Sequence, residues 1–357
     1  MTISRRIIAA SAGALVGLMG VAVALAYIGA MLSTVPSLGR LAMLTGAAPT
    51  PAGDAAPSWW ESFAKGSSEF LADAGKRTHE GILMVTPRDR EQLQSHFAAL
   101  DYALPDISAP DQRLHDVPRL YLRSLPHDLA EGESSLERKR DFVRVMLPLI
   151  LAGNEKILAD RARVEKFAEQ VRAGGNLYAL NKAWLIQLAA QYGMAEFEPD
   201  TGDWQELLRR VDAVPPSLAI AQAALESGWG TSRFAKQGNA VFGQWSWKPG
   251  SGLVPAGRNP DAEHEVRRFS QLSESVGAYL TNLNSHKYYG KFRDRRASAR
   301  AQEKIASGLE LVKYLDRYSE EGRKYIDEVR GIIEKNMLHE MDAARLRPVN
   351  RTWLASS

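Results

Sequence analysis

The stretch that decides the fold is Ser217-Leu-Ala-Ile-Ala-Gln-Ala-Ala-Leu-Glu226-Ser-Gly-Trp-Gly-Thr-Ser-Arg-Phe-Ala235. Two prolines precede it, and Ser217 is a residue type that favours the start of a helix. Gly228 and Gly230 are typical of a helix end. The pattern therefore predicts a short apolar helix over residues 218–226, with Glu226 at its carboxyl end.

Glu226 has a sequence environment that favours a protonated carboxyl group. A helix C-terminus carries partial negative charge, and the apolar Trp229 and Phe234 lie nearby in sequence, so both effects raise a carboxyl pKa. The positions three and four residues earlier hold Ala223 and Gln222, neither of which is basic. A carboxyl that keeps its proton near neutral pH suits a glycosidase acid. Taken alone, these features fit an ordinary surface glutamate at a helix end better than a catalytic one.

The surrounding sequence closely resembles glycoside hydrolase family 73, the bacterial β-N-acetylglucosaminidases of the lysozyme-like superfamily. The match begins with Ala-Leu-Glu226-Ser-Gly-Trp-Gly and continues in Phe242-Gly-Gln-Trp245 and Gly252-Leu-Val-Pro255, which resemble the Bax-type branch. Further similar segments are Glu274-Ser275, Asn282–Tyr288 and Arg138–Arg161. The resemblance covers about residues 115–340. It implies that Glu226 is the general acid that protonates the leaving oxygen.

The same resemblance implies roles for other residues. Tyr288 is similar to the active-site tyrosine of the family, and a core aromatic is the alternative. Substrate contacts are expected for Gln222, Phe242, Gln244, Trp245 and Trp247. The two tryptophans suit stacking on sugar faces, because the axial hydrogens of a pyranose fit an aromatic surface, and hydrophobic cover of the loop is their alternative. A second carboxylate is expected on the hairpin after the helix, where Asp261, Glu263 and Glu265 are available. The resemblance favours Glu265, because in the Bax-type pattern an acid directly precedes Val-Arg-Arg-Phe; an ordinary exposed strand carboxylate is the alternative for Glu265. If no second acid reaches the sugar, the N-acetyl oxygen of the substrate would act as nucleophile.

Two positions depart from the family pattern. Ala240 stands where an asparagine is usual, with Asn239 beside it as a possible substitute. Ser246 and Ser251 stand where the Bax-type branch often has a cysteine pair, so a disulfide staple is absent from this loop. Neither departure removes the chemistry at Glu226.

The pattern of apolar residues predicts a mainly α-helical domain with a small β-hairpin over residues 137–345, and the family resemblance implies that its fold is lysozyme-like. Helical stripes run from Glu137 to a stop at Gly174-Gly175, with Pro148 as an expected kink and Asn176 as the cap of the next helix. The segment 263–269 predicts a short strand. Three further helices are expected over 273–284, 297–314 and 320–336.

The amino-terminal part predicts a membrane-anchored protein. Residues 7–32 carry no charge and follow Arg5 and Arg6, which predicts a transmembrane helix with residues 1–6 in the cytoplasm. Ala24-Leu25-Ala26 leaves a cleaved signal peptide as the alternative. The remaining chain divides into a Pro/Ala-rich linker (33–57), an accessory region (58–136), the glucosaminidase domain and a tail (346–357). Either reading exports the domain, and the first places it in the periplasm on the inner membrane.

Composition narrows the function classes. The chain has 357 residues, no cysteine and a net charge of +3, so disulfides and thiolate chemistry are excluded and a nucleic-acid partner is not indicated. Its histidines show no metal-ligand spacing, and we expect neither metal nor cofactor. The basic run Lys291-Phe-Arg-Asp-Arg-Arg296 with Arg300 is typical of a solvated helix face, and binding of an anionic wall polymer is its alternative.

The sequence therefore predicts an endo-β-N-acetylglucosaminidase that acts on peptidoglycan glycan strands. A lytic transglycosylase or muramidase of the same superfamily is an alternative, because those enzymes need only one glutamate. A non-catalytic wall-binding module is another. Chitin and glycoprotein sugars stay open as substrates, because they contain the same N-acetylglucosamine unit.

Overall fold

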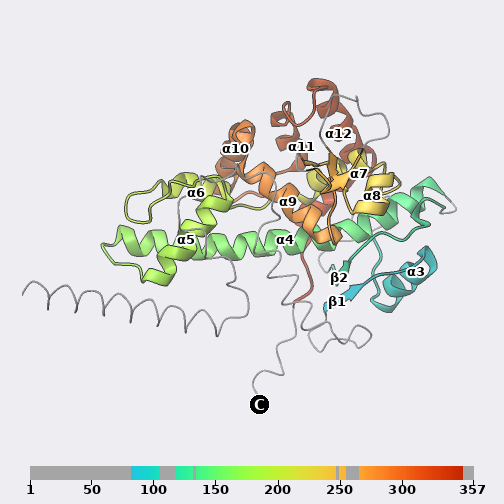
Figure 1. Ribbon diagram of the computed structural model, residues 1–357, viewed down its shortest axis with the longest axis horizontal. Helices are drawn as coiled ribbons and strands as arrows, with labels where there is room; N and C mark the ends of the chain where they lie inside the picture. The colour runs from blue at the N-terminus through green and yellow to red at the C-terminus, as the bar shows by residue number, and fades with distance from the viewer. Residues whose placement is uncertain (1–81, 105–116, 132–133, 247–248, 255–264, 349–357) are drawn as a thin grey trace, which may run out of the picture. The chain divides into compact units, whose positions relative to one another are not determined.

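The computed structural model describes residues 82–104, 117–131, 134–246, 249–254 and 265–348, all within one compact unit. The described chain is mainly helical, as the sequence predicts, and it contains two small sheets where one hairpin was expected (Figure 1). The predicted membrane segment 7–32, the linker and the end of the tail lie outside the described residues. Among the residues that are described, no helix combines the length and apolar character needed to cross a bilayer.

A single long helix, α4 (Ser135–Arg172), runs the length of the domain and organises the other elements along it (Figure 1). Ser134 caps its start by accepting a bond from the Glu137 backbone N–H at 3.1 Å. Pro148 lies inside α4, yet the helix continues to Arg172 and ends just before the predicted glycine stop. At its carboxyl end follow α5 (Ala179–Gln191) and α6 (Trp204–Arg210). The start of α5 differs from the prediction, because Tyr178 and not Asn176 occupies the cap position.

The region before α4 packs on the same core. Strands β1 (Ile82–Val85) and β2 (Arg119–Leu122) pair in parallel, with α3 (Arg90–Ala99) between them in sequence. β2 contacts α4, and buried side chains of both belong to one hydrophobic cluster. The sequence predicts only some helix and irregular chain here, because these strands are short and lack clear alternation.

Helix α7 (Pro216–Ser227) is the helix that carries Glu226. It contacts α4, α12 and the 3-10 turn Leu338–Ala343. It matches the predicted helix except at its start. Pro216 occupies the first turn, so Ser217 lies inside the helix and does not cap it. The Ser217 backbone N–H and hydroxyl both donate to Asp342, at 2.9 Å each. A carboxylate from the far end of the chain therefore takes the role that the sequence assigned to Ser217.

The remaining elements surround the end of α7. A three-stranded antiparallel sheet has the order β3-β5-β4, and it contains the predicted 263–269 strand in shortened form. The bounds of these elements are α8 (Arg233–Gly238), β3 (Trp245–Ser246), β4 (Gly252–Leu253), β5 (Glu265–Arg267), α9 (Leu272–Ser285), α10 (Gly290–Ala301), α11 (Gly308–Leu311) and α12 (Arg323–Lys335).

The predicted helix over 297–314 is wrong. The chain instead forms α10 and the short α11, separated by residues 302–307. Glu303 adopts a positive φ of 57°, which ends a helix, and Gly308 lies so close to Ser217 that a Cβ there would be 2.1 Å from the Ser217 hydroxyl. Contact with α7, which the local pattern does not reveal, therefore sets the break.

Candidate active site

Glu226 is placed by an abrupt end of α7. Gly228, Trp229 and Gly230 have φ values of 58°, 59° and 79°, so three successive residues adopt left-handed conformations. The Trp229 N–H donates to the Ala224 carbonyl at 2.8 Å and closes the last turn. A Cβ on Gly230 would lie 2.9 Å from Leu125, which leaves room only for glycine. The Gly-Trp-Gly sequence thus turns the chain away directly after Glu226.

The carboxyl group of Glu226 lies in a half-buried position. Burial raises its pKa, and a hydrogen bond from the Tyr325 side chain lowers it by less. In the part of the chain that the structure describes, no lysine or arginine forms an ion pair with this carboxyl. Desolvation without a compensating cation therefore favours the protonated acid, as the sequence predicts.

A hydrogen-bonded relay of buried side chains lies behind Glu226. The Tyr279 hydroxyl donates to Gln222 Oε1 at 2.7 Å, and Gln222 Nε2 donates to the Tyr325 hydroxyl oxygen at 2.8 Å. Because Tyr325 accepts from the amide, its own proton is directed to the Glu226 carboxyl. Burial raises the pKa of Tyr325 and Tyr279, so both hydroxyls stay protonated as donors. The relay fixes the orientation of the acid from one side.

Aromatic packing holds the relay in place. Phe242 stacks on Tyr279 with ring centroids 4.0 Å apart and an interplanar angle of 8°, and Tyr318 stacks on Tyr325 at 5.4 Å. These rings come from the loop after α8, from α9, and from α12 with the turn before it. Three elements distant in sequence thus converge on the end of α7.

The loop after Phe242 approaches the acid closely. Gly243 has a φ of 61°, and a Cβ there would lie 3.1 Å from Glu226 Oε2. The next residue, Gln244, exchanges hydrogen bonds with Ser275: its Nε2 donates to the Ser275 carbonyl and its Oε1 accepts from the Ser275 hydroxyl, both at 3.3 Å. The backbone of this loop therefore forms one wall beside the carboxyl group.

Comparison with known proteins agrees with this geometry. The glucosaminidase family model, described as mannosyl-glycoprotein endo-beta-N-acetylglucosaminidase, matches residues 202–338. Protein bax of Escherichia coli (strain K12) is 35% identical over 207 residues, which cover 57% of this chain and 70% of that protein. The chain belongs to the glucosaminidase family. No solved structure matches it, and the lysozyme-like assignment stays a prediction.

The matched glucosaminidase region, 202–338, contains Glu226, the whole relay and the hairpin, and its family supports a glycoside hydrolase type of enzyme.

Two of the residues expected to bind substrate are buried in this region. Gln222 is fully buried inside the relay, and Phe242 is 2% exposed and stacked on Tyr279. This burial is at odds with direct sugar contact by either side chain. Both support the acid from behind.

The hairpin carboxylate Glu265 is 8% exposed and faces its own loop. Its Oε1 accepts from the Gly250 N–H at 3.0 Å, and its Oε2 accepts from the Gly252 N–H at 2.8 Å. Bonds to backbone N–H groups hold a carboxylate as a loop brace. Catalysis by Glu265 stays a prediction, and the alternatives Asp261 and Glu263 lie outside the described residues.

The two departures from the family pattern have structural counterparts in this hairpin. The hydroxyls of Ser246 and Ser251 form a hydrogen bond of 2.6 Å, so a polar contact joins the positions where a disulfide was expected to be missing. The Asn239 side chain donates to the Phe269 carbonyl at 3.1 Å, while Ala240 packs against Val266 and Phe269. Asn239 thus ties the end of α8 to the chain after β5.

Two aromatic side chains remain available on the surface. Trp245 is 52% exposed on β3, and Tyr288 is 53% exposed. The Tyr288 ring has His286 at 4.8 Å between centroids and the Arg317 guanidinium 5.9 Å from its centroid. Both positions suit a sugar contact, which stays a prediction for each. Trp247 lies outside the described residues.

Sequence reasoning missed the tyrosines of the relay. Tyr325 follows Glu226 by 99 positions, and no local spacing links the two. The expected solvated face over 291–300 is also partly wrong. Arg293 and Arg296 are 3% and 2% exposed and donate to backbone carbonyls, including Leu283 and Ala213.

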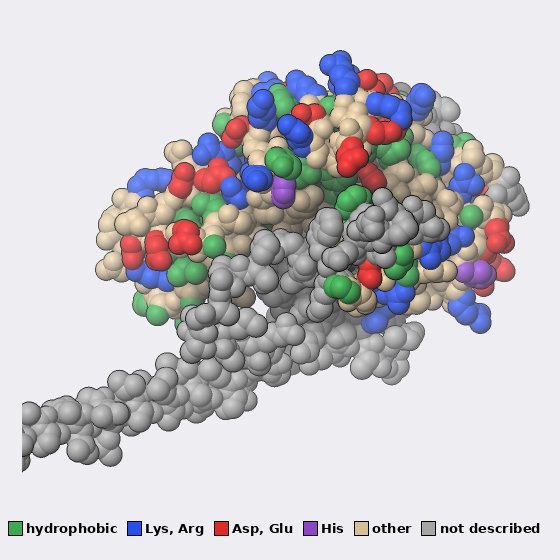
Figure 2. Space-filling view, turned by 45° about the horizontal axis from the view of Figure 1, so that its top comes forward, with side chains coloured by type: hydrophobic (Ala, Val, Ile, Leu, Met, Phe, Trp, Pro, Cys, Tyr) green, Lys and Arg blue, Asp and Glu red, His purple; other side chains and the backbone are tan. Residues whose placement is uncertain are grey.

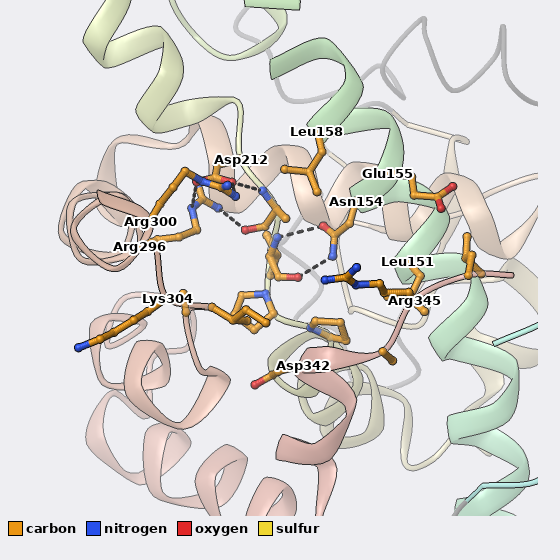
Figure 3. A pocket seen from close by; sticks show the side chains of 18 residues that line it. Leu151, Asn154, Glu155, Leu158, Asp212, Arg296, Arg300, Lys304, Asp342 and Arg345 are labelled. Carbon is orange, nitrogen blue, oxygen red and sulfur yellow. Dashed lines mark hydrogen bonds and ion pairs between the residues drawn. The ribbon is translucent and has the colours of Figure 1, made fainter. Parts of the chain in front are cut away.

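A separate pocket of about 510 Å³ lies at the opposite end of α7 (Figure 3). Its charged side chains largely satisfy one another: Arg296 and Arg300 surround Asp212, and Asn154 exchanges bonds with the Val214 backbone. In the described ranges no group of three or more His, Asp or Glu side chains is arranged to hold a metal ion. The half-buried acid at Glu226 is therefore the better candidate for chemistry.

Proposed function

We propose that the chain is a peptidoglycan hydrolase that cleaves glycan strands as an endo-β-N-acetylglucosaminidase. The observation that carries the proposal is a half-buried glutamate without a cation partner, held by a tyrosine donor, within a glucosaminidase family domain. Such a carboxyl retains its proton at a higher pH than an ordinary glutamate and is suited to protonate a glycosidic oxygen.

The relay stabilises Glu226 after the carboxyl group has given up its proton. Once Glu226 has given its proton to the leaving oxygen, the Tyr325 hydroxyl donates to the carboxylate that forms, and Gln222 keeps that hydroxyl oriented. A positioned donor that meets developing charge lowers the barrier without reorganisation during the reaction. Bonds to Tyr279 and Tyr325 at the two ends of the Gln222 amide fix the direction of the donors.

The state of the expected second carboxylate, Glu265, gives support to alternative mechanisms that need only one glutamate. Both oxygens of Glu265 accept bonds from the hairpin backbone, so this carboxylate is held as a brace and is not free to act as base. This favours either a substrate-assisted hydrolase, which uses the N-acetyl oxygen, or a lytic transglycosylase, which needs one glutamate. The endo-glucosaminidase remains the preferred proposal because the matching family model carries that description.

The reaction product decides between these proposals. Purified sacculi are digested with the protein, and the new ends of the released fragments are identified by mass spectrometry after borohydride reduction. Reduced N-acetylglucosamine at the new end supports the proposed glucosaminidase. Anhydro-muramic acid would show a lytic transglycosylase, and reduced muramic acid would show a muramidase.

We further propose that the protein is anchored in the inner membrane with this domain in the periplasm. The uncharged run 7–32 after Arg5 and Arg6 supports an anchor, and a cleaved signal that exports the domain is the alternative. Cell fractionation with protease treatment of spheroplasts tests this. Retention of intact protein in the cytoplasmic fraction would contradict both readings.

A further inference from the structure

A second hollow lies beside the carboxyl end of α7, on the outer side of α12. This groove, of about 800 Å³, lies between the end of α7, the outer face of α12 and Lys139 of α4. Its apolar lining consists of Leu225, Trp229 and Ile332, all partly buried against the core. We call it the α7–α12 groove.

The groove carries positive charge that the domain itself does not neutralise. Within the described residues, Lys139, Arg323 and Lys335 have no ion pair, whereas Lys324 is paired with Glu321 at 2.7 Å and with Glu328 at 3.6 Å. Asp327 is the remaining acid of the lining, so three unpaired cations face one unpaired carboxylate.

This excess is local. On the face shown in Figure 2, basic and acidic side chains are interspersed over the surface, without one continuous basic field. Lys139 Nζ also lies 5.1 Å from the centre of the Trp229 ring, a cation–π contact that holds one charge over the apolar lining. A cationic rim around an apolar floor is a combination that binds an anionic chain with small apolar groups.

The groove and the acid share both of their supporting helices. Leu225 directly precedes Glu226 on α7, and Trp229 belongs to the turn that ends this helix. On α12, the groove residue Lys324 directly precedes Tyr325, whose hydroxyl bonds Glu226. The groove therefore lies along the same two helices that carry the acid and its hydrogen-bond donor, within reach of a substrate that extends beyond the scissile bond.

We propose that the α7–α12 groove binds the peptide stem of peptidoglycan, through its free carboxylates. This inference rests on the proposed function, because cleavage after N-acetylglucosamine leaves N-acetylmuramic acid as the departing sugar, and that sugar carries the stem. A chain stripped of its stems keeps only the lactyl carboxylate beside each muramic acid ring, whereas the stem carries free carboxylates and methyl groups farther from the sugar. Arg323 and Lys335 are the cations that meet stem carboxylates, while the floor accepts the methyl groups of stem alanines.

The test compares two substrates with one double variant. Wild-type protein and Arg323→Ala/Lys335→Ala are assayed on peptide-bearing glycan chains and on the same chains stripped of their stems by an amidase. We expect wild type to cleave the peptide-bearing chains faster, and the variant to reduce this preference by roughly three- to tenfold, as expected for two solvent-exposed charge contacts. The reduction shrinks at high salt.

A matched control removes a positive charge elsewhere. Lys304→Ala alters an exposed lysine that lines the pocket at the other end of α7 (Figure 3), and it should keep the wild-type preference. An equal loss in the double variant and the control, or an unchanged preference in the double variant, would overturn the stem-binding proposal. A variant that slows cleavage of both substrates equally would instead place the glycan in the groove.

The activity of the wild-type protein on the two substrates separates the stem-binding proposal from the proposed function. If wild type cleaves both substrates at equal rates, the proposed function stands and stem binding is rejected. If wild type cleaves neither, the proposed function itself fails. Binding provides a second readout, measured by NMR titration of the inactive Glu226→Gln protein. This protein should bind a disaccharide tetrapeptide more tightly than the disaccharide alone. Introducing Arg323→Ala and Lys335→Ala into the same protein should remove that difference.

Discussion

A half-buried carboxyl group lies at the carboxyl end of helix α7 and a buried one lies in the chain just before its amino end, and their surroundings shift the two pKa values in opposite directions. At the carboxyl end, burial raises the pKa of Glu226 and only a tyrosine opposes it. Beside the amino end, burial also acts on Asp212, which is 1% exposed, but Arg296, Arg300 and Arg161 hold its pKa below the ordinary value. The same desolvation thus yields a proton donor at one end and a permanent anion at the other.

The difference shows that pairing, and not burial alone, decides the role of a buried acid. Asp212 accepts from Arg300 Nε at 2.8 Å and is flanked by Arg296 at 3.8 Å, so its charge holds α10 against the chain before α7. Glu226 has a hydrogen-bond donor in place of a cation, and its proton stays available. A structural and a chemical carboxyl are therefore distinguished by their partners.

The largest expected effect comes from removing the acid itself. Glu226→Gln keeps the shape but not the titratable proton, and we expect activity on sacculi to fall by roughly 10²- to 10⁴-fold. Because the folded-state pKa of Glu226 is raised, its carboxylate opposes folding as pH rises through that pKa, so the variant should unfold at an equal or higher temperature at neutral pH. Glycan release is followed together with thermal unfolding.

Equal glycan release by wild type and Glu226→Gln, with both proteins pelleting on sacculi, would identify a wall-binding module without activity. Glu226 would then not be a proton donor in catalysis, and the contrast with the structural role of Asp212 would no longer hold.

The next effect tests the other end of α7. Asp212→Ala leaves Arg296, which is 2% exposed, without its counter-charge, and we expect a loss of about 3–5 kcal/mol in the free energy of unfolding. In wild type the stabilisation by Asp212 is present at neutral pH and is lost as pH falls through its lowered pKa. Urea unfolding measures both. The exposed ion pair between Glu321 and Lys324 at the start of α12 is the control, and Glu321→Ala should cost less than about 1 kcal/mol.

A smaller effect is expected for the relay. Tyr325→Phe removes the bond that favours the Glu226 carboxylate, so the pKa of Glu226 should rise further and the alkaline limb of the pH–rate profile should move to higher pH. We also expect kcat to fall by roughly tenfold, because the carboxylate left after proton transfer loses a charged hydrogen bond. A fall in kcat with an unmoved limb would reduce Tyr325 to a packing role.

The smallest effect concerns the exposed face of the hairpin. Trp245→Ala should raise KM for glycan by a few fold with little change in kcat, because a half-exposed ring contributes about 1 kcal/mol to binding equally in ground and transition states. Initial rates over a range of solubilised glycan concentrations separate the two constants. An unchanged KM would mean that the sugar does not contact this tryptophan.

Local sequence was sufficient for the carboxyl end of α7 and for the acid. The predicted helix ends at Glu226, and α7 ends one residue later, at Ser227. The prediction succeeds there because helix-breaking residues and apolar spacing act over only a few residues. The glutamate was found by the helix-end argument together with the resemblance in the surrounding motif. The break between α10 and α11 was not found, because it depends on the contact of Gly308 with α7.

The sequence by itself determined a mainly helical protein, the position of a glutamate at a helix end, and its membership of a glycosidase family, since each is written in neighbouring residues. Only the tertiary structure decided what surrounds that glutamate. Tyr325 meets Glu226, and Asp342 meets Ser217, across 99 and 125 positions of chain. Burial and pairing at such distances depend on how helices pack, and no local spacing encodes them.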